Sequence, residues 1–312
     1  MGSHTVRMPN WPGLVLTIGG ALVAVSALVA VELYRLDSID ADPRGLAIVA
    51  LLGTLAFAAG LIYTAIRQIR VKRVLPPERY RGPSVLILLA LALIIAGILN
   101  IPFTDDAIAL IDGDGELTVL GGIVILVDTQ IALLLVSWLL VHRARSLAAL
   151  PSFPGRDPAG ALRVGFGWGL IAWLGWTIVI IAVGLMLEQL GRPPEPEVAE
   201  RAIAMLDPWV VSIGIVILGP IAEEIFFRGV VFNAWLREGG RKWAYLGSAT
   251  LFAAIHLSLP LLLPIFILGL ALAWVYERTG NLLAPIAMHA TVNGISVALA
   301  LMVRFELIKL PV

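Results

Sequence analysis

Long apolar runs are the feature that most constrains how this chain can fold. Runs of about 20 mostly apolar residues, the length with which an α-helix crosses a bilayer, recur along the sequence, and only 14% of the residues are charged while 59% are hydrophobic. The sustained alternation that is typical of membrane β-strands is not seen. We therefore predict an all-α, polytopic membrane helix bundle with eight or nine transmembrane helices. The predicted spans are 11–34, 45–67, 83–104, 118–141, 161–187, 209–236, 243–262, 263–277 and 281–303. Within 243–277, the steps at Pro260 and Pro264 allow a short turn or a kink.

The charged residues between these runs predict an orientation. Basic residues concentrate in three connections, at 67–81, 142–163 and 237–242, and the positive-inside rule assigns these connections to the cytoplasm. The acidic connections, which we predict to lie outside, are at 37–42, 105–116 and 195–200. The N-terminus is then cytoplasmic. Because arginine greatly outnumbers lysine, which is typical of a GC-rich prokaryotic genome, we expect a prokaryotic plasma membrane.

The sequence divides into three regions. Residues 1–10 are interpreted as a tag remnant and N-terminal tail, because the first four residues resemble a cloning scar. The basic, proline-containing stretch at 142–160 ends an N-terminal four-helix membrane region, 11–160, whose role no motif reveals. We expect the C-terminal region, 161–312, to hold every unusual intramembrane polar residue. The absence of cysteine excludes thiol chemistry, and a net charge of +0 gives no bulk attraction to nucleic acid.

An acidic pair in the sixth apolar run is the first chemical signal. Glu223 lies near the middle of this run, about 20 Å from either end at ~1.5 Å per helical residue, and ionisable groups at this depth mark functional sites. Arg228 shares a helical face with Glu224 and is predicted to neutralise it. Glu223 points elsewhere and is left for another task. One turn earlier, Gly219 and Pro220 are predicted to loosen the backbone and admit water.

The histidines are few, and two of them lie in apolar surroundings. His256 falls inside the predicted 243–262 helix, while His289 and Asn293 are four residues apart and share one face. Each of these residues alone also fits an interhelical polar clamp. His142 sits in a basic cluster and is predicted to be solvated. Together the buried groups suit water activation by a carboxylate, with histidine and asparagine stabilising an oxyanion, and they equally suit a zinc ion with an open position.

These motifs resemble those of the CAAX-protease and bacteriocin-processing family of intramembrane proteases, which includes the Ras-converting enzyme. The family's Glu-Glu-x-x-x-Arg motif is matched by Glu223, Glu224 and Arg228. Its Phe-x-x-x-His motif is matched by Phe252 and His256, and its His-x-x-x-Asn motif by His289 and Asn293. The Gly-rich helix that usually stands between the last two, with its Thr-Gly turn, is matched by Gly269, Thr279 and Gly280. The resemblance covers roughly residues 161–312.

The resemblance implies an endopeptidase that cuts near the membrane. In this family, one form of this activity is C-terminal CAAX processing. The resemblance also implies that Glu223 activates water with help from His256, and that His289 and Asn293 stabilise the oxyanion. Glu224 and Arg228 are then supporting residues, with Phe252 packed beside a histidine. It leaves open a zinc-dependent version that uses Glu223, His256 and His289 as ligands. Because asparagine is a poor zinc ligand, we favour hydrolysis without a cofactor.

Two other function classes stay open. Glu223 also fits a proton relay in a membrane transporter, although the N-terminal region holds no counterpart of the motifs, whereas transporters often consist of repeats. The other class is a non-catalytic membrane partner that keeps the protease fold. The partners that we expect are membrane lipids and a peptide or lipidated protein substrate, and no nucleic acid. The oligomeric state stays open.

Overall fold

The computed structural model of the chain describes residues 11–35, 43–76, 78–100, 118–143, 145, 157–191 and 198–308. The predicted all-α fold is confirmed over these residues, although the tag remnant and most of the acidic connections lie outside them. The helices of the N-terminal region are α1 (Trp11–Arg35), α2 (Pro43–Lys72), α3 (Val85–Asn100) and α4 (Val119–Val136), which continues into a π-helix, η3 (Ser137–Arg143). Those of the C-terminal region are α5 (Pro158–Gln189), α6 (Val198–Met205), α7 (Pro208–Val211), η4 (Ser212–Leu218), α8 (Gly219–Glu224), η5 (Ile225–Phe232), α9 (Asn233–Glu238), α10 (Arg241–Ala254), α11 (Leu262–Thr279) and α12 (Leu283–Arg304).

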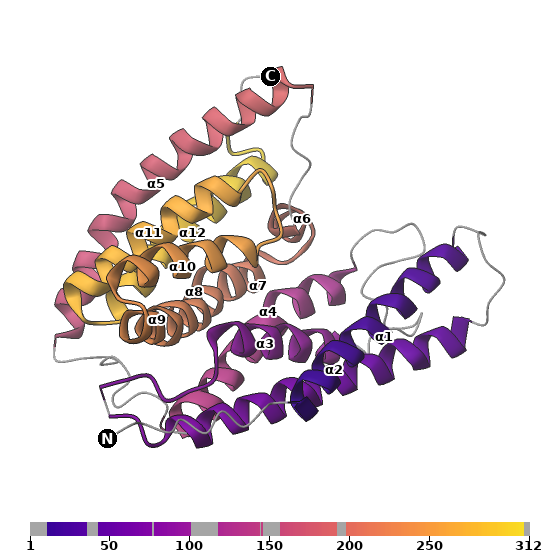
Figure 1. Ribbon diagram of the computed structural model, residues 1–312. Coiled ribbons are helices and arrows are strands. Elements are labelled where there is room, and N and C mark those ends of the chain that lie inside the picture. The colour runs from indigo at the N-terminus through magenta and orange to yellow at the C-terminus, as the bar shows by residue number, and fades with distance from the viewer. Residues whose placement is uncertain are drawn as a thin grey trace.

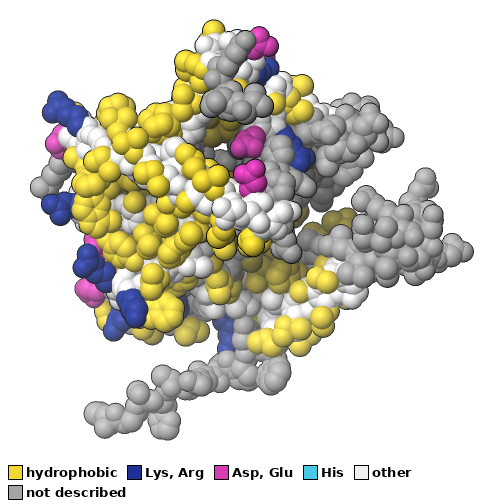
Figure 2. Space-filling model, turned by 90° about the horizontal axis from the view of Figure 1, so that it is seen from above, with side chains coloured by type: hydrophobic (Ala, Val, Ile, Leu, Met, Phe, Trp, Pro, Cys, Tyr) yellow, Lys and Arg dark blue, Asp and Glu magenta, His cyan; other side chains and the backbone are white. Residues whose placement is uncertain are grey.

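The lengths of the helices fit a membrane. By length and composition, six helical stretches of the described chain are able to cross a bilayer, and two shorter apolar stretches, Pro12–Ala27 and Val85–Leu99, lie within α1 and α3. Together they make eight, the lower of the two predicted counts. On the face shown in Figure 2, hydrophobic side chains cover much of the described surface, most charged side chains lie along its edge, and acidic side chains also lie near its middle. On α5, for example, the side chain of Ile178 is 68% exposed, as a lipid-facing residue would be.

The predicted span 243–262 ends early, and the short turn that its proline step allowed is present. α10 ends at Ala254, and the chain makes a turn before α11 begins at Leu262. Pro260 explains the interruption, because it has no backbone N–H and its ring would clash with the carbonyl of residue 256 in a continuous helix. Within the turn, Leu257 adopts a left-handed φ of 52°. The short α10 is therefore not among the helices that can cross a bilayer unaided.

The N-terminal helices reach the C-terminal bundle through α4. Figure 1 shows α1 and α2 as a hairpin on one side of the molecule, with α3 and α4 between this hairpin and the remaining helices. The hairpin is closely packed, since a Cβ atom on Gly20 would lie 2.3 Å from the backbone nitrogen of Phe57. α4 packs against η4 and α8, in the middle of the 208–238 helical stretch. The two regions therefore share a continuous interior.

Small residues also bring α5 and α12 together. A Cβ atom on Gly165 would lie 2.2 Å from the carbonyl oxygen of Ala284, and one on Gly169 would lie 2.5 Å from Cβ of Thr291. Backbones that approach this closely are a common packing mode for membrane helices. The contact matters for function because α12 carries His289, two residues before Thr291.

Candidate active site

The helical stretch at 208–238 is not a regular α-helix. The six-residue segment α8, which ends at Glu224, lies between two π-helical segments, η4 and η5. A π-helix widens the helix by one residue per turn, and such segments occur frequently at functional sites. Glu223 therefore lies in a short α-helical segment with a π-helical segment on either side.

Pro220 determines one of the hydrogen bonds that cross the site. In η4 the N–H of Gly219 donates to the carbonyl of Gly214, five residues earlier. The same pattern would pair the carbonyl of Ile215 with residue 220, but proline has no N–H to donate. Asn293 on α12 fills this position, since its Nδ2 atom lies 2.9 Å from the Ile215 oxygen. Asn293, the predicted oxyanion residue, thus uses one amide hydrogen in helix packing. Because a carboxamide nitrogen carries two hydrogens, the second is available to the site.

The predicted pair of Glu224 and Arg228 is confirmed. Nη1 of Arg228 lies 2.7 Å from Oε1 of Glu224, and both side chains are fully buried. Nη2 of Arg228 also donates to the carbonyl of Gly269 at 3.0 Å, and the guanidinium carbon lies 4.5 Å from the centre of the Phe252 ring. The buried cation is therefore balanced by a carboxylate and held by a carbonyl and an aromatic face.

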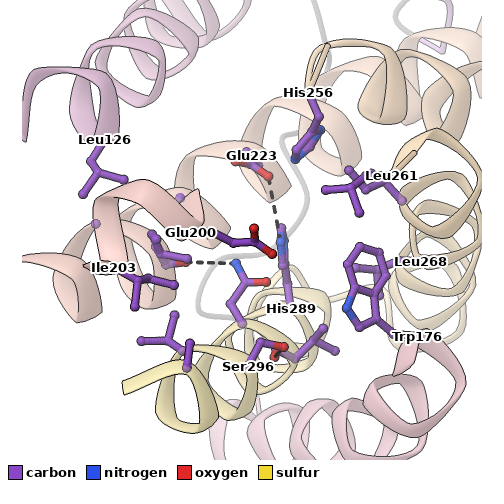
Figure 3. Close-up of a pocket in the computed structure, with 18 of the residues that line it drawn as sticks. Leu126, Trp176, Glu200, Ile203, Glu223, His256, Leu261, Leu268, His289 and Ser296 are labelled. Atoms are coloured by element: carbon purple, nitrogen blue, oxygen red, sulfur yellow. Dashed lines mark hydrogen bonds and ion pairs between the residues drawn. The ribbon is translucent and has the colours of Figure 1, made fainter. Parts of the chain in front are cut away.

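His289 stands between the two glutamates. Its Nδ1 atom lies 3.0 Å from Oε1 of Glu224, and its Nε2 atom lies 3.9 Å from Oε2 of Glu223. A carboxylate only accepts hydrogen bonds, so Nδ1 carries the proton in this contact. Nε2 is then directed toward Glu223, with the distance between them longer than a hydrogen bond. Figure 3 shows this pair joined by a dashed line across the cavity.

His256 lies in the turn after α10 rather than inside a helix, which corrects its predicted position. Its Nδ1 atom lies 2.7 Å from the carbonyl oxygen of Phe252, one helical turn earlier. Since a carbonyl only accepts, Nδ1 donates and Nε2 is left for other contacts. Phe252 packs edge-on against both histidines, at 5.2 Å from the ring centre of His256 and 5.6 Å from that of His289, as predicted for this residue.

A cavity of about 400 Å³ brings the predicted residues together. Its lining includes all four predicted catalytic residues, Glu223, His256, His289 and Asn293. Figure 3 shows Glu223, His256 and His289 pointing into it from three different elements, with Trp176, Leu261 and Leu268 on one wall and Leu126 and Ile203 opposite. A water molecule takes about 30 Å³ in the liquid, so the cavity has room for a water and for part of a substrate. His142, by contrast, is exposed at the end of η3, as predicted.

Sequence reasoning missed several polar residues of the cavity, among them Gln130, Glu200 and Ser296. Gln130 on α4 lines the cavity, and its Oε1 atom is buried without a hydrogen-bond donor among the described residues. Its Nε2 atom and Oε1 of Glu223 both lie within 4 Å of the point where a Cβ on Gly219 would stand. The expectation that the C-terminal region holds every unusual polar residue is therefore wrong. The three consecutive polar residues Asp128, Thr129 and Gln130 within an apolar span could have indicated this contribution of α4. Glu200, expected in an outer connection, lies in the first turn of α6 and also lines the cavity.

The candidate zinc ligands do not form a metal site in this arrangement. Among the described residues, no group of three or more His, Asp or Glu side chains is arranged to hold a metal ion. Glu223 and His289 approach each other, but the set completed by His256 does not converge.

Comparison with known proteins confirms the family resemblance for part of the chain. Residues 205–295 match the family described as "Type II CAAX prenyl endopeptidase Rce1-like". This segment contains all three motifs, from Glu223 to Asn293, and it is shorter than the predicted 161–312. With its apolar helices, the chain is an integral membrane protein.

Three curated bacterial proteins are similar to this chain over part of their length. "Putative membrane peptidase YdiL" of Bacillus subtilis (strain 168) is 30% identical over 112 residues, which are 36% of this chain and 46% of that protein. "UPF0177 protein YxdF" of Lactococcus lactis subsp. lactis (strain IL1403) is 35% identical over 78 residues, 25% of this chain and 42% of that protein. "Uncharacterized 24.3 kDa protein" of Escherichia coli is 31% identical over 138 residues, 40% of this chain and 63% of that protein. The chain thus spans about half the length of these relatives. No solved structure matches it.

Proposed function

Because residues 205–295 match the Rce1-like endopeptidases, we propose that this protein is an intramembrane endopeptidase in which Glu223 activates the attacking water. One observation carries the proposal. Oε2 of Glu223 is buried, accepts no hydrogen bond from the described protein groups, and belongs to the cavity that both histidines line. A buried carboxylate oxygen in a cavity large enough for water accepts its hydrogen bond from water. It is then in place to take the proton of that water.

The proposed reaction gives each of the four side chains a separate role. Glu223 removes a proton as the water oxygen attacks the carbonyl carbon of the scissile bond, and it later passes this proton to the leaving amine. His256, whose Nδ1 donates to Phe252, accepts the second hydrogen of the water at Nε2 and so orients it. Nε2 of His289, when it carries a hydrogen, and the second amide hydrogen of Asn293 donate to the oxyanion that develops on the carbonyl oxygen.

The Glu224–Arg228 pair has a positioning role in this scheme. Glu224 accepts from both Arg228 and Nδ1 of His289 through the same oxygen, Oε1. This fixes the imidazole orientation and directs Nε2 toward the cavity, much as the aspartate of a Ser-His-Asp triad orients its histidine. Arg228 keeps the carboxylate from being an uncompensated buried charge.

Gln130 has a substrate-binding role in the same scheme. Its buried Oε1 atom is an acceptor without a protein donor, and a peptide presents backbone N–H groups on either side of the bond that is cut. An N–H group of the bound substrate satisfies Gln130, in a cavity that also has apolar walls for the substrate's side chains. The N-terminal region thereby acquires a function, because α4 supplies one contact to the substrate.

The experiment compares wild type with Glu223→Gln and His256→Ala in lipid nanodiscs. The substrates are peptides that end in a CAAX-like sequence, with and without a prenyl group, and the membrane proteome of cells that express each form. Wild type is expected to cut and both variants to lose about 10²-fold or more of the rate, while their helix content and melting temperature stay unchanged. Full proteolysis by Glu223→Gln would show that the mechanism is wrong. Proton uptake into vesicles without any cleavage would favour the transporter class.

A further inference from the structure

Four arginines line a second cavity, away from the candidate active site. This cavity has a volume of about 270 Å³ and is lined by Ile69, Arg73, Arg81, Arg143 and Arg145. The arginines come from two connections that are far apart in the sequence, one after α2 and one at the end of η3. We propose that this cavity binds a phosphate-bearing anion, and that the ligand in the membrane is the headgroup of an anionic phospholipid.

The positive charge of the cavity favours binding of an anion. Among the described residues, none of the four guanidinium groups forms an ion pair with a carboxylate. The Lys and Arg side chains that do form ion pairs there are Lys72, Arg228 and Arg241. The neighbouring segment 146–156, outside the described residues, contains no Asp or Glu in its sequence. Like charges that share one cavity repel each other, and a ligand of opposite charge removes that repulsion. Guanidinium groups present planar, forked donors that match phosphate oxygens.

Two of the four arginines are held in place. Nε of Arg81 donates to the carbonyl oxygen of Leu75 at 2.9 Å, and its Nη2 atom donates to the same oxygen. Arg143 lies over the ring of Trp138, with its guanidinium carbon 5.8 Å from the ring centre. Side chains that are already oriented lose less entropy when they bind a ligand. Arg81 and Arg143 are therefore partly oriented before a ligand binds.

The surroundings favour a lipid over a free anion. Val71 and Trp138, close in sequence to the arginines, are 64% and 51% exposed, and Ile66 and Leu139 are 42% and 44% exposed. Exposed apolar side chains directly beside cations, with a tryptophan among them, are typical of the membrane–water interface. Basic pockets at the cytoplasmic ends of membrane helices bind anionic headgroups. The acyl chains would then cover the apolar side chains while the phosphate lies among the arginines.

The same end of the molecule joins the two regions of the chain. Nζ of Lys72, at the end of α2, lies 2.7 Å from Oε1 of Glu238, the last residue of α9. Nη1 of Arg79 donates to the carbonyl oxygen of Arg237 at 3.1 Å. A lipid at the arginine cavity therefore binds next to the contact between the N-terminal helices and the end of the helical stretch that carries Glu223. Binding is expected to stabilise this junction.

The test uses the purified full chain and does not depend on proteolytic activity. Binding and melting temperature are measured with vesicles of phosphatidylglycerol in phosphatidylcholine, with phosphatidylcholine alone, and with inorganic phosphate. Wild type is compared with Arg81→Gln/Arg143→Gln, with the charge-preserving Arg81→Lys/Arg143→Lys, and with the matched control Arg163→Gln/Arg201→Gln. The control changes two exposed arginines that do not line the cavity.

We expect phosphatidylglycerol to bind wild type and the control alike, and to raise both melting temperatures. The Gln variant is expected to lose about tenfold or more in affinity, because it loses charge-assisted hydrogen bonds, and the Lys variant to lose less. Equal competition by inorganic phosphate would support the anion site and assign it to free phosphate. Equal binding by the Gln variant and wild type, or by the two vesicle types, would overturn the proposal. A Gln variant that does not fold leaves the Lys variant to decide, since full loss there would contradict a charge-based site.

Discussion

Nδ1 of His289 lies 3.0 Å from Oε1 of Glu224, although 65 positions separate the two residues in the sequence. The contact links α12 to α8 in the interior of the bundle and uses the same oxygen that accepts from Arg228. Glu224 is therefore more than the partner of an arginine, because it also orients the histidine that faces Glu223. The first prediction follows from this double role.

Replacing Glu224 with alanine should destabilise the protein and disturb His289 together. The substitution leaves Arg228 buried without its carboxylate, for which the expected loss is about 3–5 kcal/mol in the free energy of unfolding. Thermal unfolding in nanodiscs measures this loss, with Glu188→Ala at an exposed position of α5 as the control. A melting temperature equal to that of wild type would contradict the ion-pair argument.

Asn293 offers a way to separate packing from catalysis. Asn293→Ala leaves the carbonyl of Ile215 without a donor, which should lower the free energy of unfolding by about 1–3 kcal/mol. Adding Pro220→Ala supplies a backbone N–H at residue 220, so stability should recover. Cleavage should stay lost in the double variant, because the oxyanion still lacks its amide. Recovery of both stability and cleavage would mean that Asn293 acts through packing alone.

Gln130 should affect substrate binding more than the chemical step. Gln130→Leu removes the acceptor with little change in volume, and the loss of one hydrogen bond to the substrate should raise KM about tenfold with kcat nearly unchanged. Gln130→Asn, which keeps a neutral amide acceptor, should restore part of the affinity. Thr129→Val on the same helix serves as the control. An unchanged KM in Gln130→Leu would rule out the proposed substrate contact.

The close approach of α5 to α12 predicts a position-specific effect of glycine substitutions. Gly169→Ala places a Cβ 2.5 Å from Cβ of Thr291, so α12 must shift and cleavage should fall. Gly167→Ala on the same helix meets nothing within 4 Å. It should be neutral or stabilise the helix by up to about 1 kcal/mol. Cleavage rates and melting temperatures of the two variants check this, and equal effects would show that α12 tolerates displacement.

Chelation should leave the activity unchanged. The proposed mechanism places the proton transfer on Glu223 and uses His256 and His289 as hydrogen-bonding groups, so removing divalent metals should not alter the rate. Metal analysis of the purified protein and cleavage after dialysis against a chelator measure this directly. Stoichiometric zinc whose removal abolishes cleavage, and whose return restores it, would replace this mechanism with the zinc-dependent version.

Sequence reasoning reached the features that depend on local spacing. The four-residue interval between Glu224 and Arg228 is enough to place both on one helical face, and the pairing in the structure follows from it. The length and apolarity of the runs were likewise enough to predict a membrane bundle. Helix geometry alone carries these inferences, because the relevant atoms belong to the same turn or the same span.

The remaining features depend on how helices pack, which spacing does not determine. The contact of His289 with Glu224 requires a particular rotation of α12 against α8, and the position of Gln130 requires α4 to lie against the same segment. His256 lies in the turn between α10 and α11, and the apolar run alone did not show where α10 ends, although Pro260 interrupts it. In each case the position of the side chain was determined by a tertiary contact or by an interruption of the helix, and not by the periodicity of the sequence.

The position of α4 against the cavity has a consequence for what counts as the smallest working unit. The family match begins at residue 205, yet part of the cavity wall comes from Leu126 and Gln130, which precede it by a long stretch of chain. An excised 205–295 fragment would present Glu223 to lipid on the side where α4 stands. Transplanting the three motifs into another scaffold would therefore transfer the reactive groups without the enclosure that selects what reaches them.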